Sequence, residues 1–460
     1  MEKENLTDTI AAISTALGEG GIGIVRISGR GALKIADRIF ISKSKEKPSA
    51  FKTYTTHYGK IADGSRVIDE VILTLMRSPK SYTREDVVEI NCHGGIAAVR
   101  AVLKLVLRHG ARLADPGEFT RRAFLNGRID LSQAEAVLDI IRAKTDYALK
   151  VGEEQLRGGL SLKINQCREK LLNALSYLEA GIDFPEEESL SPGLNNVVAE
   201  LSSAAGILKE LLDSSSFARI LREGLLLVIC GKPNTGKSSL LNAILKEERS
   251  IVTPVAGTTR DTIEEVLDIK GIPVRMVDTA GILRPRNLVE KKALERSKKA
   301  IASEDLIILL FDGSRRLSAE DLLLMNKLKS KRVIAAINKI DLRQKIEREK
   351  IASFFGQAVS ICDKKPKNIA LLEQAILKEA SCGLGVSHEA AMVGNLRHVE
   401  KLRKAQKNVA QALKSLDNSL APEFVAQEIK EALDFLDVIL GKKFNADLLD
   451  RIFSEFCIGK

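Results

Sequence analysis

The residues from Gly231 to Ser239 have the types and the spacing of a phosphate-binding loop. They match the pattern G-x-x-x-x-G-K-[ST], with the first glycine at Gly231 and the last position at Ser238. The glycines let backbone N–H groups turn toward phosphate oxygens, Lys237 adds a charge near the outer phosphates, and the Ser238 hydroxyl can bind Mg²⁺. An apolar strand at 225–230 precedes the loop, and a helix is expected to open at 240–245. The expected nucleotide contacts in this loop are Asn234, Thr235, Gly236, Lys237, Ser238 and Ser239.

Three later segments predict that the nucleotide is GTP and that it is hydrolysed. The segment Asp278-Thr279-Ala280-Gly281 ends an apolar strand, where the aspartate can reach the Mg²⁺ shell and the glycine N–H can meet the γ-phosphate. The segment Asn338-Lys339-Ile340-Asp341 follows the strand 333–337, and its last carboxylate can accept two hydrogen bonds from guanine that adenine does not offer. Between them, Gly257-Thr258-Thr259 supplies a threonine hydroxyl for the Mg²⁺ site. The order of these segments is that of a GTPase.

The residue after Gly281 is Ile282, where many GTPases have a glutamine that orients the attacking water. An alkyl side chain cannot hold a water molecule, so water orientation and charge stabilisation must come from other groups. Asn234 is placed to help hold a monovalent cation near the phosphates. It is equally well explained as a turn residue that tolerates left-handed backbone geometry. Both interpretations stay open.

Length and composition describe a multidomain protein. The chain has 460 residues, enough for roughly three domains, and 45% hydrophobic with 29% charged residues is typical of globular proteins. The net charge of +10 is compatible with an RNA partner, whereas 4% aromatic residues and no Trp argue against base stacking as the main binding mode. No apolar run approaches the roughly 20 residues of a membrane span, and the start lacks the order of a signal peptide. We expect a cytoplasmic location without a membrane partner.

The first 120 residues are expected to form an α+β domain. Strands are predicted at 20–29, 71–76 and 87–90, and helices at 31–40 and 96–108. Arg26 and Glu89 are charges within apolar strands, so each must face water or meet a partner. An exposed sheet face and a ligand site are both compatible with them.

The remainder is predicted to be a helical bundle with a GTPase domain inserted in it. Helical spacing dominates to about residue 222 and resumes at 395–416, 422–440 and 446–456. The turn Lys270-Gly271 predicts a hairpin between 264–269 and 272–278, which gives the otherwise parallel GTPase sheet one antiparallel strand. The expected boundaries are 1–120 for the N-terminal domain, 121–222 and 382–460 for the two parts of the helical domain, and 223–381 for the inserted α/β P-loop GTPase domain.

Over its entire length the chain resembles the MnmE (TrmE) family of tRNA modification GTPases. Besides the GTPase motifs, the resemblance rests on the segments 25–29, 89–95, 116–120 and 122–131 and on the terminal Phe456-Cys457-Ile458-Gly459-Lys460. It implies a homodimer whose N-terminal domain binds a tetrahydrofolate one-carbon donor, as the 5-formyl or 5,10-methylene form. It also implies a potassium-stimulated GTPase. With the flavoprotein MnmG (GidA), which supplies FAD, the family adds a carboxymethylaminomethyl or aminomethyl group to C5 of the wobble uridine of certain tRNAs.

The resemblance also implies roles for particular residues. Folate contacts fall on Arg26, Glu89, Arg128 and Lys460, and Cys457 is a possible functional thiol. Potassium ligands fall on Asn234, Thr253, Val255 and Thr258, Mg²⁺ ligands on Ser238 and Thr259, and further GTP contacts on Pro254 and Ala256. The water-orienting carboxylate falls on Glu290, which takes the role that Ile282 cannot fill.

This chain departs from the family pattern at four positions. They are Leu17 in place of Pro, Arg128 in place of Lys, Ala293 in place of Gly and Ile361 in place of Ala. Arginine at 128 keeps the charge but changes its shape. The change at Ala293 puts the flexibility of the segment that carries Glu290 in question.

Two other functions share parts of this pattern. A GTPase that acts as a ribosome-assembly switch would have every nucleotide motif, but it would need neither the folate-binding domain nor the Cys457 tail. A folate-dependent transferase with a regulatory GTPase would keep that domain and turn over without a flavoprotein. Folate binding would distinguish the family function from the ribosome-assembly switch. Dependence on the flavoprotein would distinguish it from the folate-dependent transferase.

Overall fold

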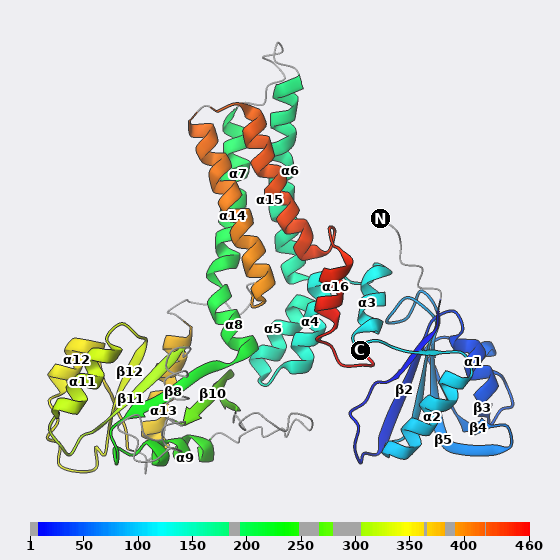
Figure 1. Ribbon diagram of the computed structural model, residues 1–460, viewed down its shortest axis with the longest axis horizontal. Coiled ribbons are helices and arrows are strands. Elements are labelled where there is room, and N and C mark those ends of the chain that lie inside the picture. The colour runs from blue at the N-terminus through cyan, green and yellow to red at the C-terminus, as the bar shows by residue number, and fades with distance from the viewer. Residues whose placement is uncertain are drawn as a thin grey trace. The chain divides into compact units, whose positions relative to one another are not determined.

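The computed structural model describes residues 8–183, 194–247, 266–278, 305–362, 366–381, 392–418 and 420–460 (Figure 1). Contacts divide the chain into two units. Unit 1 comprises Met1–Leu138 with Asp437–Lys460, and unit 2 comprises Asp139–Leu436. Residues 121–138 and the C-terminal tail therefore group with the N-terminal sheet, although they were expected to belong to the helical domain. Within the described residues, no helix is both long enough and apolar enough to cross a membrane.

Unit 1 is built on a seven-stranded sheet in the order β3-β4-β5-β6-β2-β1-β7. Its elements are β1 Ile10–Ile13, β2 Ile22–Ser28, α1 Ala32–Ile39, β3 Phe40–Ser42, η1 Pro48–Ala50, β4 Thr55–Asp63, β5 Arg66–Met76, β6 Val87–His93, α2 Ile96–Arg108, β7 Arg112–Leu113, α3 Glu118–Leu125 and α16 Ala446–Phe453. Alternate residues of β5 (Val71, Leu73, Leu75) are buried against α1 and α2, as the period of two along a strand requires. The predicted strands and both predicted helices of this region are confirmed.

The last helix ends earlier than predicted. α16 covers Ala446–Phe453 rather than 446–456, and Ser454 forms its C-cap. Phe456 leaves the helix because its ring packs with Phe453 and the side chains of α4 in a separate apolar cluster. The chain after α16 is thereby directed back to the N-terminal sheet.

Unit 2 contains a bundle of long helices. Its helices are α5 Asp146–Leu156, α6 Gly159–Asp183, α7 Leu194–Asp213, α8 Ser215–Glu223 and α14 Leu396–Asp417, while α4 Leu131–Arg142 and α15 Pro422–Leu440 cross the division between the units. α7 packs against α6 and α14. α15 joins this group through a hydrogen bond from Asn408 to Glu431 at 2.9 Å and an ion pair between Lys430 and Glu179 at 3.0 Å.

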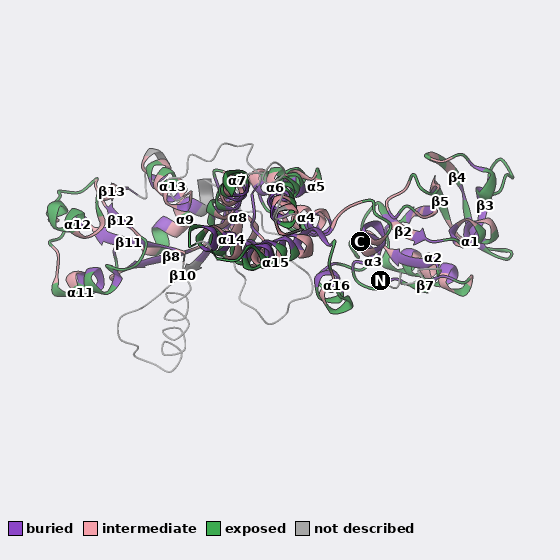
Figure 2. Ribbon diagram, turned by 90° about the horizontal axis from the view of Figure 1, so that it is seen from above, coloured by how far each residue is buried: buried purple, intermediate pink, exposed green. Residues whose placement is uncertain are grey.

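The second sheet lies between β8 and β13 in the sequence and has the order β13-β12-β11-β8-β10-β9. Its elements are β8 Leu225–Gly231, α9 Lys237–Glu247, β9 Val266–Ile269, β10 Ile272–Asp278, β11 Leu306–Asp312, α11 Ala319–Leu328, β12 Val333–Asn338, α12 Arg348–Phe355, β13 Val359–Ser360 and α13 Pro366–Ala380. Among the described strands of this sheet, β9 alone is antiparallel to its neighbour, which confirms the hairpin predicted at Lys270-Gly271. Apolar clusters cover both faces, with α9 and α13 on one and α11 and α12 on the other. Figure 2 shows the central strands buried.

Helices from both sides of the insertion contact this sheet. Phe217 of α8 and Met392 lie in the same apolar cluster as strands β8, β9 and β10, and Tyr147 of α5 packs against it. Gln155 of α5 donates a hydrogen bond to the Met392 carbonyl at 2.9 Å. The chain that enters the second sheet and the chain that leaves it are thus fixed to one another.

Candidate functional site

The phosphate-binding loop lies where the carboxyl ends of four strands meet. β8 ends at Gly231, and in the sheet register Asp278 of β10 lies opposite Ile229 while Leu310 of β11 lies opposite Gly231. Ligands of such sheets bind at this edge. Gly231 has φ +148°, and a Cβ atom there would lie 2.5 Å from the Leu310 carbonyl oxygen. Only glycine fits this turn.

Lys237 and Ser238 begin α9 directly after the loop. The Lys237 Nζ donates hydrogen bonds to the carbonyls of Gly231 at 3.0 Å and Lys232 at 2.8 Å, so its charge lies over the loop. The Ser238 and Ser239 side chains are exposed. A phosphate bound here would meet a lysine charge, a hydroxyl and the N-terminus of a helix.

Asn338 and Lys339 hold the loop from the next strand. The Asn338 Nδ2 donates to the Thr235 carbonyl at 3.0 Å, and the Lys339 Nζ donates to the Asn234 carbonyl at 2.8 Å. These two hydrogen bonds connect the backbone of the loop to the end of β12. The structure therefore brings together the predicted phosphate-binding loop and the predicted segment Asn338-Lys339-Ile340-Asp341.

Asp312 is a site residue that the sequence motifs did not identify. Its carboxylate accepts from the Lys339 Nζ at 2.7 Å. Burial raises the pKa of Asp312, but the hydrogen bonds from Lys339 and Ser314 outweigh that effect and hold its pKa below the usual range. Asp312 positions Lys339, which positions the loop. The signal was present, since Asp312 ends an apolar strand as Asp278 does.

Asp341 is exposed and lies three residues after the end of β12. The Ile340 N–H donates to the Ile361 carbonyl at 3.5 Å, and the Ile361 N–H donates to the Ile337 carbonyl at 2.8 Å. The segments that follow β12 and β13 therefore lie side by side. Ile361, one of the four positions at which this chain departs from the family pattern, is fully buried there. The role of Asp341 in guanine recognition stays a prediction.

Asn234 has a left-handed backbone with φ +64°, as its interpretation as a turn residue requires. Its side chain is exposed and has no hydrogen-bond partner among the described residues, so the amide oxygen remains free to bind a cation. Both interpretations therefore remain compatible with the structure. Next to it, Lys232 donates to the Ser318 hydroxyl at 2.7 Å and pairs with Asp321 at 2.9 Å, which ties the loop to the N-terminus of α11.

Several predicted residues lie outside the described part of the chain. They are Thr253, Pro254, Val255, Ala256, Gly257, Thr258, Thr259, Thr279, Ala280, Gly281, Ile282, Glu290 and Ala293. Asp278 is described only as the last residue of β10.

A second candidate site lies in unit 1, where Arg26 and Glu89 face each other across β2 and β6. The Arg26 Nε donates to the Glu89 Oε1 at 2.8 Å, and both side chains are about four-fifths buried, with 18% and 19% exposure. Each charge in an apolar strand has thus met a partner, rather than lying on a fully exposed face. Among the described residues, nothing hydrogen-bonds to the second carboxylate oxygen of Glu89, which leaves an acceptor available for a ligand.

The C-terminal tail docks beside this pair. The Gly459 carbonyl accepts from Arg26 Nη1 at 3.2 Å and from the Ser14 hydroxyl at 3.1 Å, and the Lys460 carbonyl accepts from the Phe119 N–H at 3.2 Å. Gly459 has φ +95°, and a Cβ there would lie 2.2 Å from the Ile13 carbonyl oxygen. The residue is glycine because the tail approaches the sheet so closely. Cys457 is exposed on this tail.

Arg128 lies over the ring of Tyr82, with its guanidinium carbon 4.8 Å from the ring centroid. The Tyr82 hydroxyl is 2.9 Å from the Thr120 hydroxyl. Burial raises the pKa of Tyr82, and the Thr120 hydrogen bond and the charges of Arg128 and Arg26 act against this. Tyr82 packs against the cluster that contains Phe119, and the Arg26 guanidinium carbon lies 5.6 Å from the Phe119 ring centroid. Arg26, Glu89, Arg128 and the Gly459–Lys460 backbone therefore surround one region, with Tyr82 as an aromatic member that sequence motifs did not predict.

A buried charge network surrounds Arg122 of α3 in the same unit. The Arg122 side chain is fully buried and contacts three carboxylates, at 2.6 Å from Asp8, 2.9 Å from Glu118 and 3.2 Å from Glu85. Arg112 pairs with Glu118 at 2.6 Å. Burial raises the pKa of Glu118, but Arg112, the Asp115 N–H and Arg122 outweigh it and hold that pKa below the usual range. Glu118 and Arg122 belong to segments that carry the family resemblance, but the sequence pattern did not indicate that they form a buried network.

The mostly parallel sheet, the phosphate loop after β8 and the segment Asn338-Lys339-Ile340-Asp341 after β12 are the features of a P-loop GTPase domain. Two family models match the chain, the MnmE helical domain over residues 131–457 and the GTP-binding protein TrmE N-terminus over residues 9–128. The tRNA modification GTPases MnmE of Clostridioides difficile (strain 630) and Bacillus subtilis (strain 168) are 48% and 43% identical to it, over 99% and 98% of this chain and 100% of each relative. The chain belongs to the MnmE family of tRNA modification GTPases, so it is a GTP-binding hydrolase that acts in tRNA processing.

A solved structure, the G domain of the T. maritima FeoB iron transporter, matches 34% of this chain and 98% of that chain at 27% identity, with a TM-score of 0.27.

Proposed function

We propose that this protein, in the cytoplasm and as a homodimer, hydrolyses GTP with potassium stimulation to drive modification of the wobble uridine in certain tRNAs. With the flavoprotein MnmG and its FAD, it adds a carboxymethylaminomethyl or aminomethyl group at C5. A reduced folate held in unit 1, as the 5-formyl or 5,10-methylene form, supplies the carbon. The observation that carries this proposal is the Arg26–Glu89 pair beside the docked tail, in a chain whose other unit has a complete phosphate loop.

The proposal assigns each required group to particular residues, of which those at 253–259 lie outside the described part of the chain. Ser238, in the first turn of α9, and Asp278, the last residue of β10, would hold Mg²⁺ together with Thr259, which lies outside the described residues. The ion neutralises phosphate charge when bound. Asn234, with Thr253, Val255 and Thr258, would hold the potassium ion. Glu89 would accept hydrogen bonds from a pterin ring, while Arg26, Arg128 and Lys460 would pair with pterin acceptors or the anionic tail of the folate.

The two alternatives make different demands on unit 1. A ribosome-assembly switch has no use for a largely buried ion pair that the C-terminal tail contacts, and membership of a tRNA-modifying family disfavours this alternative further. A folate-dependent transferase with a regulatory GTPase would use the same pair. If tRNA modification requires the flavoprotein, the transferase alternative is excluded. If modification proceeds without the flavoprotein, the transferase alternative is favoured.

GTP hydrolysis is expected to be at least about tenfold faster in potassium than in sodium at equal ionic strength, because a cation of fitting size supplies charge stabilisation that Ile282 cannot. Asn234→Ala should erase the difference. The matched control is Asn242→Ala, an exposed asparagine of α9 away from the loop, which should preserve it. Steady-state rates of GTP hydrolysis in the two salts test this prediction. Equal rates for the wild-type protein would contradict the proposed potassium site.

Glu89→Ala is expected to weaken binding of a reduced folate by about tenfold or more, because a pterin donor left unpaired costs roughly 1–3 kcal/mol. GTP turnover should not change, since the P-loop belongs to the other unit. The control is Glu70→Ala, an exposed carboxylate of β5 in the same sheet. Calorimetry with 5-formyltetrahydrofolate measures the effect, and wild-type affinity in Glu89→Ala would exclude Glu89 from the site.

A further inference from the structure

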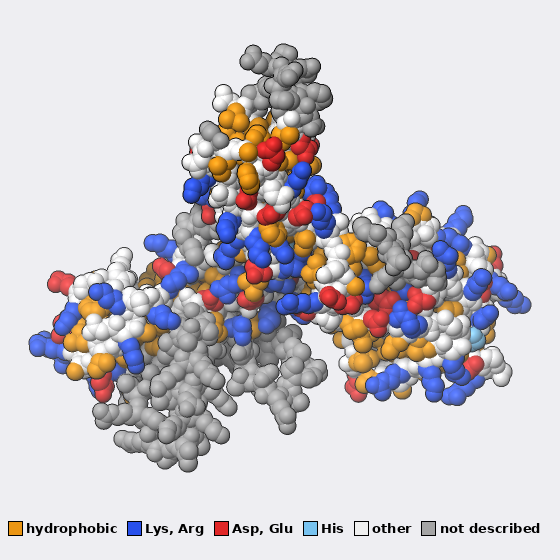
Figure 3. All heavy atoms as spheres, turned by 45° about the horizontal axis from the view of Figure 1, so that its top comes forward, with side chains coloured by type: hydrophobic (Ala, Val, Ile, Leu, Met, Phe, Trp, Pro, Cys, Tyr) orange, Lys and Arg blue, Asp and Glu red, His pale blue; other side chains and the backbone are white. Residues whose placement is uncertain are grey.

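Helix α14 carries a run of positive charge that the GTPase and folate sites do not use. Between residues 401 and 416 it has five cations and no acidic residue, namely Lys401, Arg403, Lys404, Lys407 and Lys414. Glu400 precedes the run and Asp417 follows it. Figure 3 shows Lys and Arg side chains gathered on this part of the bundle.

Three of these cations form a stripe on the outer face of the helix. Arg403, Lys407 and Lys414 are exposed, and at 100° per residue they lie within about 40° of one another. The buried residues Leu402, Val409 and Leu416 belong to the opposite face. At 1.5 Å per residue the stripe is about 16 Å long.

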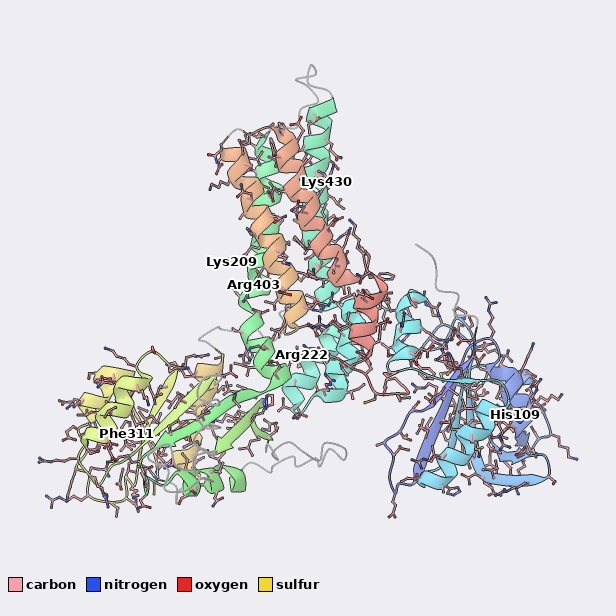
Figure 4. The ribbon with its side chains drawn as sticks, viewed as in Figure 1. His109, Lys209, Arg222, Phe311, Arg403 and Lys430 are labelled. Atoms are coloured by element: carbon pink, nitrogen blue, oxygen red, sulfur yellow. The ribbon has the colours of Figure 1, made fainter. Side chains whose placement is uncertain are left out.

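Neighbouring positions extend the charged surface. Lys401 and Lys404 place their ammonium groups over the Phe435 ring of α15, at 5.5 and 5.8 Å from its centroid. Lys209 of the adjoining helix α7 is exposed, and Figure 4 shows it at the same end of the bundle as Arg403.

Three other cations of the bundle, in contrast, have an acidic partner on a neighbouring helix. Lys163 pairs with Glu210, Lys170 with Glu200 and Lys430 with Glu179, each across two helices at about 3 Å. Within the described residues, none of the five cations between 401 and 416 forms an ion pair. Like charges at positions i and i+4, such as Arg403 and Lys407, destabilise a helix by some tenths of a kcal/mol. The stripe therefore costs stability and is not explained by the packing of the bundle.

We infer that the outer face of α14, defined by Arg403, Lys407 and Lys414, binds the phosphodiester backbone of the tRNA. The charge complements a polyanion, and the family of this chain modifies tRNA. Lysine and arginine form this face, and Lys401 and Lys404 lie over the nearby Phe435 ring. This favours phosphate contact over base stacking, so the face positions tRNA without reading its sequence. The inference extends the proposed function, on which it depends for direct contact between this chain and tRNA.

The test compares tRNA affinity of the full-length protein with that of the triple variant Arg403→Gln, Lys407→Gln, Lys414→Gln. The matched control, Lys43→Gln, Lys45→Gln, Lys47→Gln, removes the same charge from an exposed segment of unit 1. Fluorescence anisotropy with a labelled tRNA transcript, repeated between 50 and 200 mM salt, measures affinity and its salt dependence. GTP hydrolysis rates verify that each variant is folded.

The triple variant is expected to bind tRNA about tenfold or more weakly and to lower the salt slope by about 2–3, because three phosphate contacts are lost. Its GTP hydrolysis and the tRNA affinity of the control variant should stay at wild-type values. Equal losses in both variants would show a general charge effect and overturn the inference. Wild-type tRNA affinity in the triple variant, with loss of flavoprotein binding, would overturn it in favour of an acidic protein surface.

Absence of tRNA binding by the wild-type protein would also overturn it. The proposed function would then still be judged separately, by analysis of the tRNA nucleosides.

Discussion

Arg122→Met is expected to lower the free energy of unfolding of unit 1 by about 3 kcal/mol, because it removes the cation shared by Glu118, Glu85 and Asp8. Breaking a buried ion network costs about 3–5 kcal/mol in general. The lower end applies because Arg112 still pairs with Glu118 at 2.6 Å. Methionine fills much of the volume of the arginine stem, so lost charge pairing dominates the effect.

Hydrogen–deuterium exchange of the full chain measures this loss locally. Peptides from β1 and β2 should exchange faster in Arg122→Met, while peptides from β11 in the other unit provide an internal reference. Arg100→Met, an exposed arginine of α2, is the control and should change stability by less than about 0.5 kcal/mol. A similarly small effect of Arg122→Met would show that the network does not stabilise unit 1.

The loss of unfolding free energy caused by Arg122→Met should depend on pH. The folded-state pKa of Glu118 lies below its ordinary value of 4.5, so its pairing stabilises the fold above that pH. That contribution is lost as the pH falls through the folded-state pKa. Wild type should therefore lose stability on acidification below about pH 4.5, and the difference between wild type and variant should shrink there.

Glu290→Ala is expected to slow GTP hydrolysis by about 10²-fold or more without weakening GTP binding. The magnitude is that of a positioned acid–base group, and Ile282 offers no substitute for orienting the water. Glu295→Ala removes a carboxylate from the same segment and should leave hydrolysis unchanged. Single-turnover rates beside nucleotide affinity separate the outcomes, and a parallel loss of rate and affinity would make Glu290 a structural residue.

Elements with strong local patterns were predictable from the sequence. The helices 96–108 and 422–440 match α2 and α15, and the Lys270-Gly271 turn fixed the one antiparallel strand of the second sheet. In these segments, apolar periodicity and turn residues act locally, and packing does not override them.

Contacts between distant parts of the chain were not predictable in the same way. The Arg26 contact with the Gly459 carbonyl joins residues 433 positions apart, and Arg122 reaches Asp8 across 114 positions. A charge within an apolar strand signalled that Arg26 and Glu89 needed partners, but the sheet register decided that they pair with each other. Arg122 lay in a segment that marked the family, yet only the fold shows that it is buried.

The central claim, that GTP hydrolysis and a folate site on one chain serve wobble uridine modification, is tested most directly in tRNA itself. Nucleosides of bulk tRNA are measured by mass spectrometry in cells that lack this protein and express wild type, Glu89→Ala or Glu290→Ala. The account predicts that wild type restores the C5 group on the wobble uridine and that each variant leaves that uridine without it. Full modification in cells without the protein, or in cells with either variant, would contradict the account.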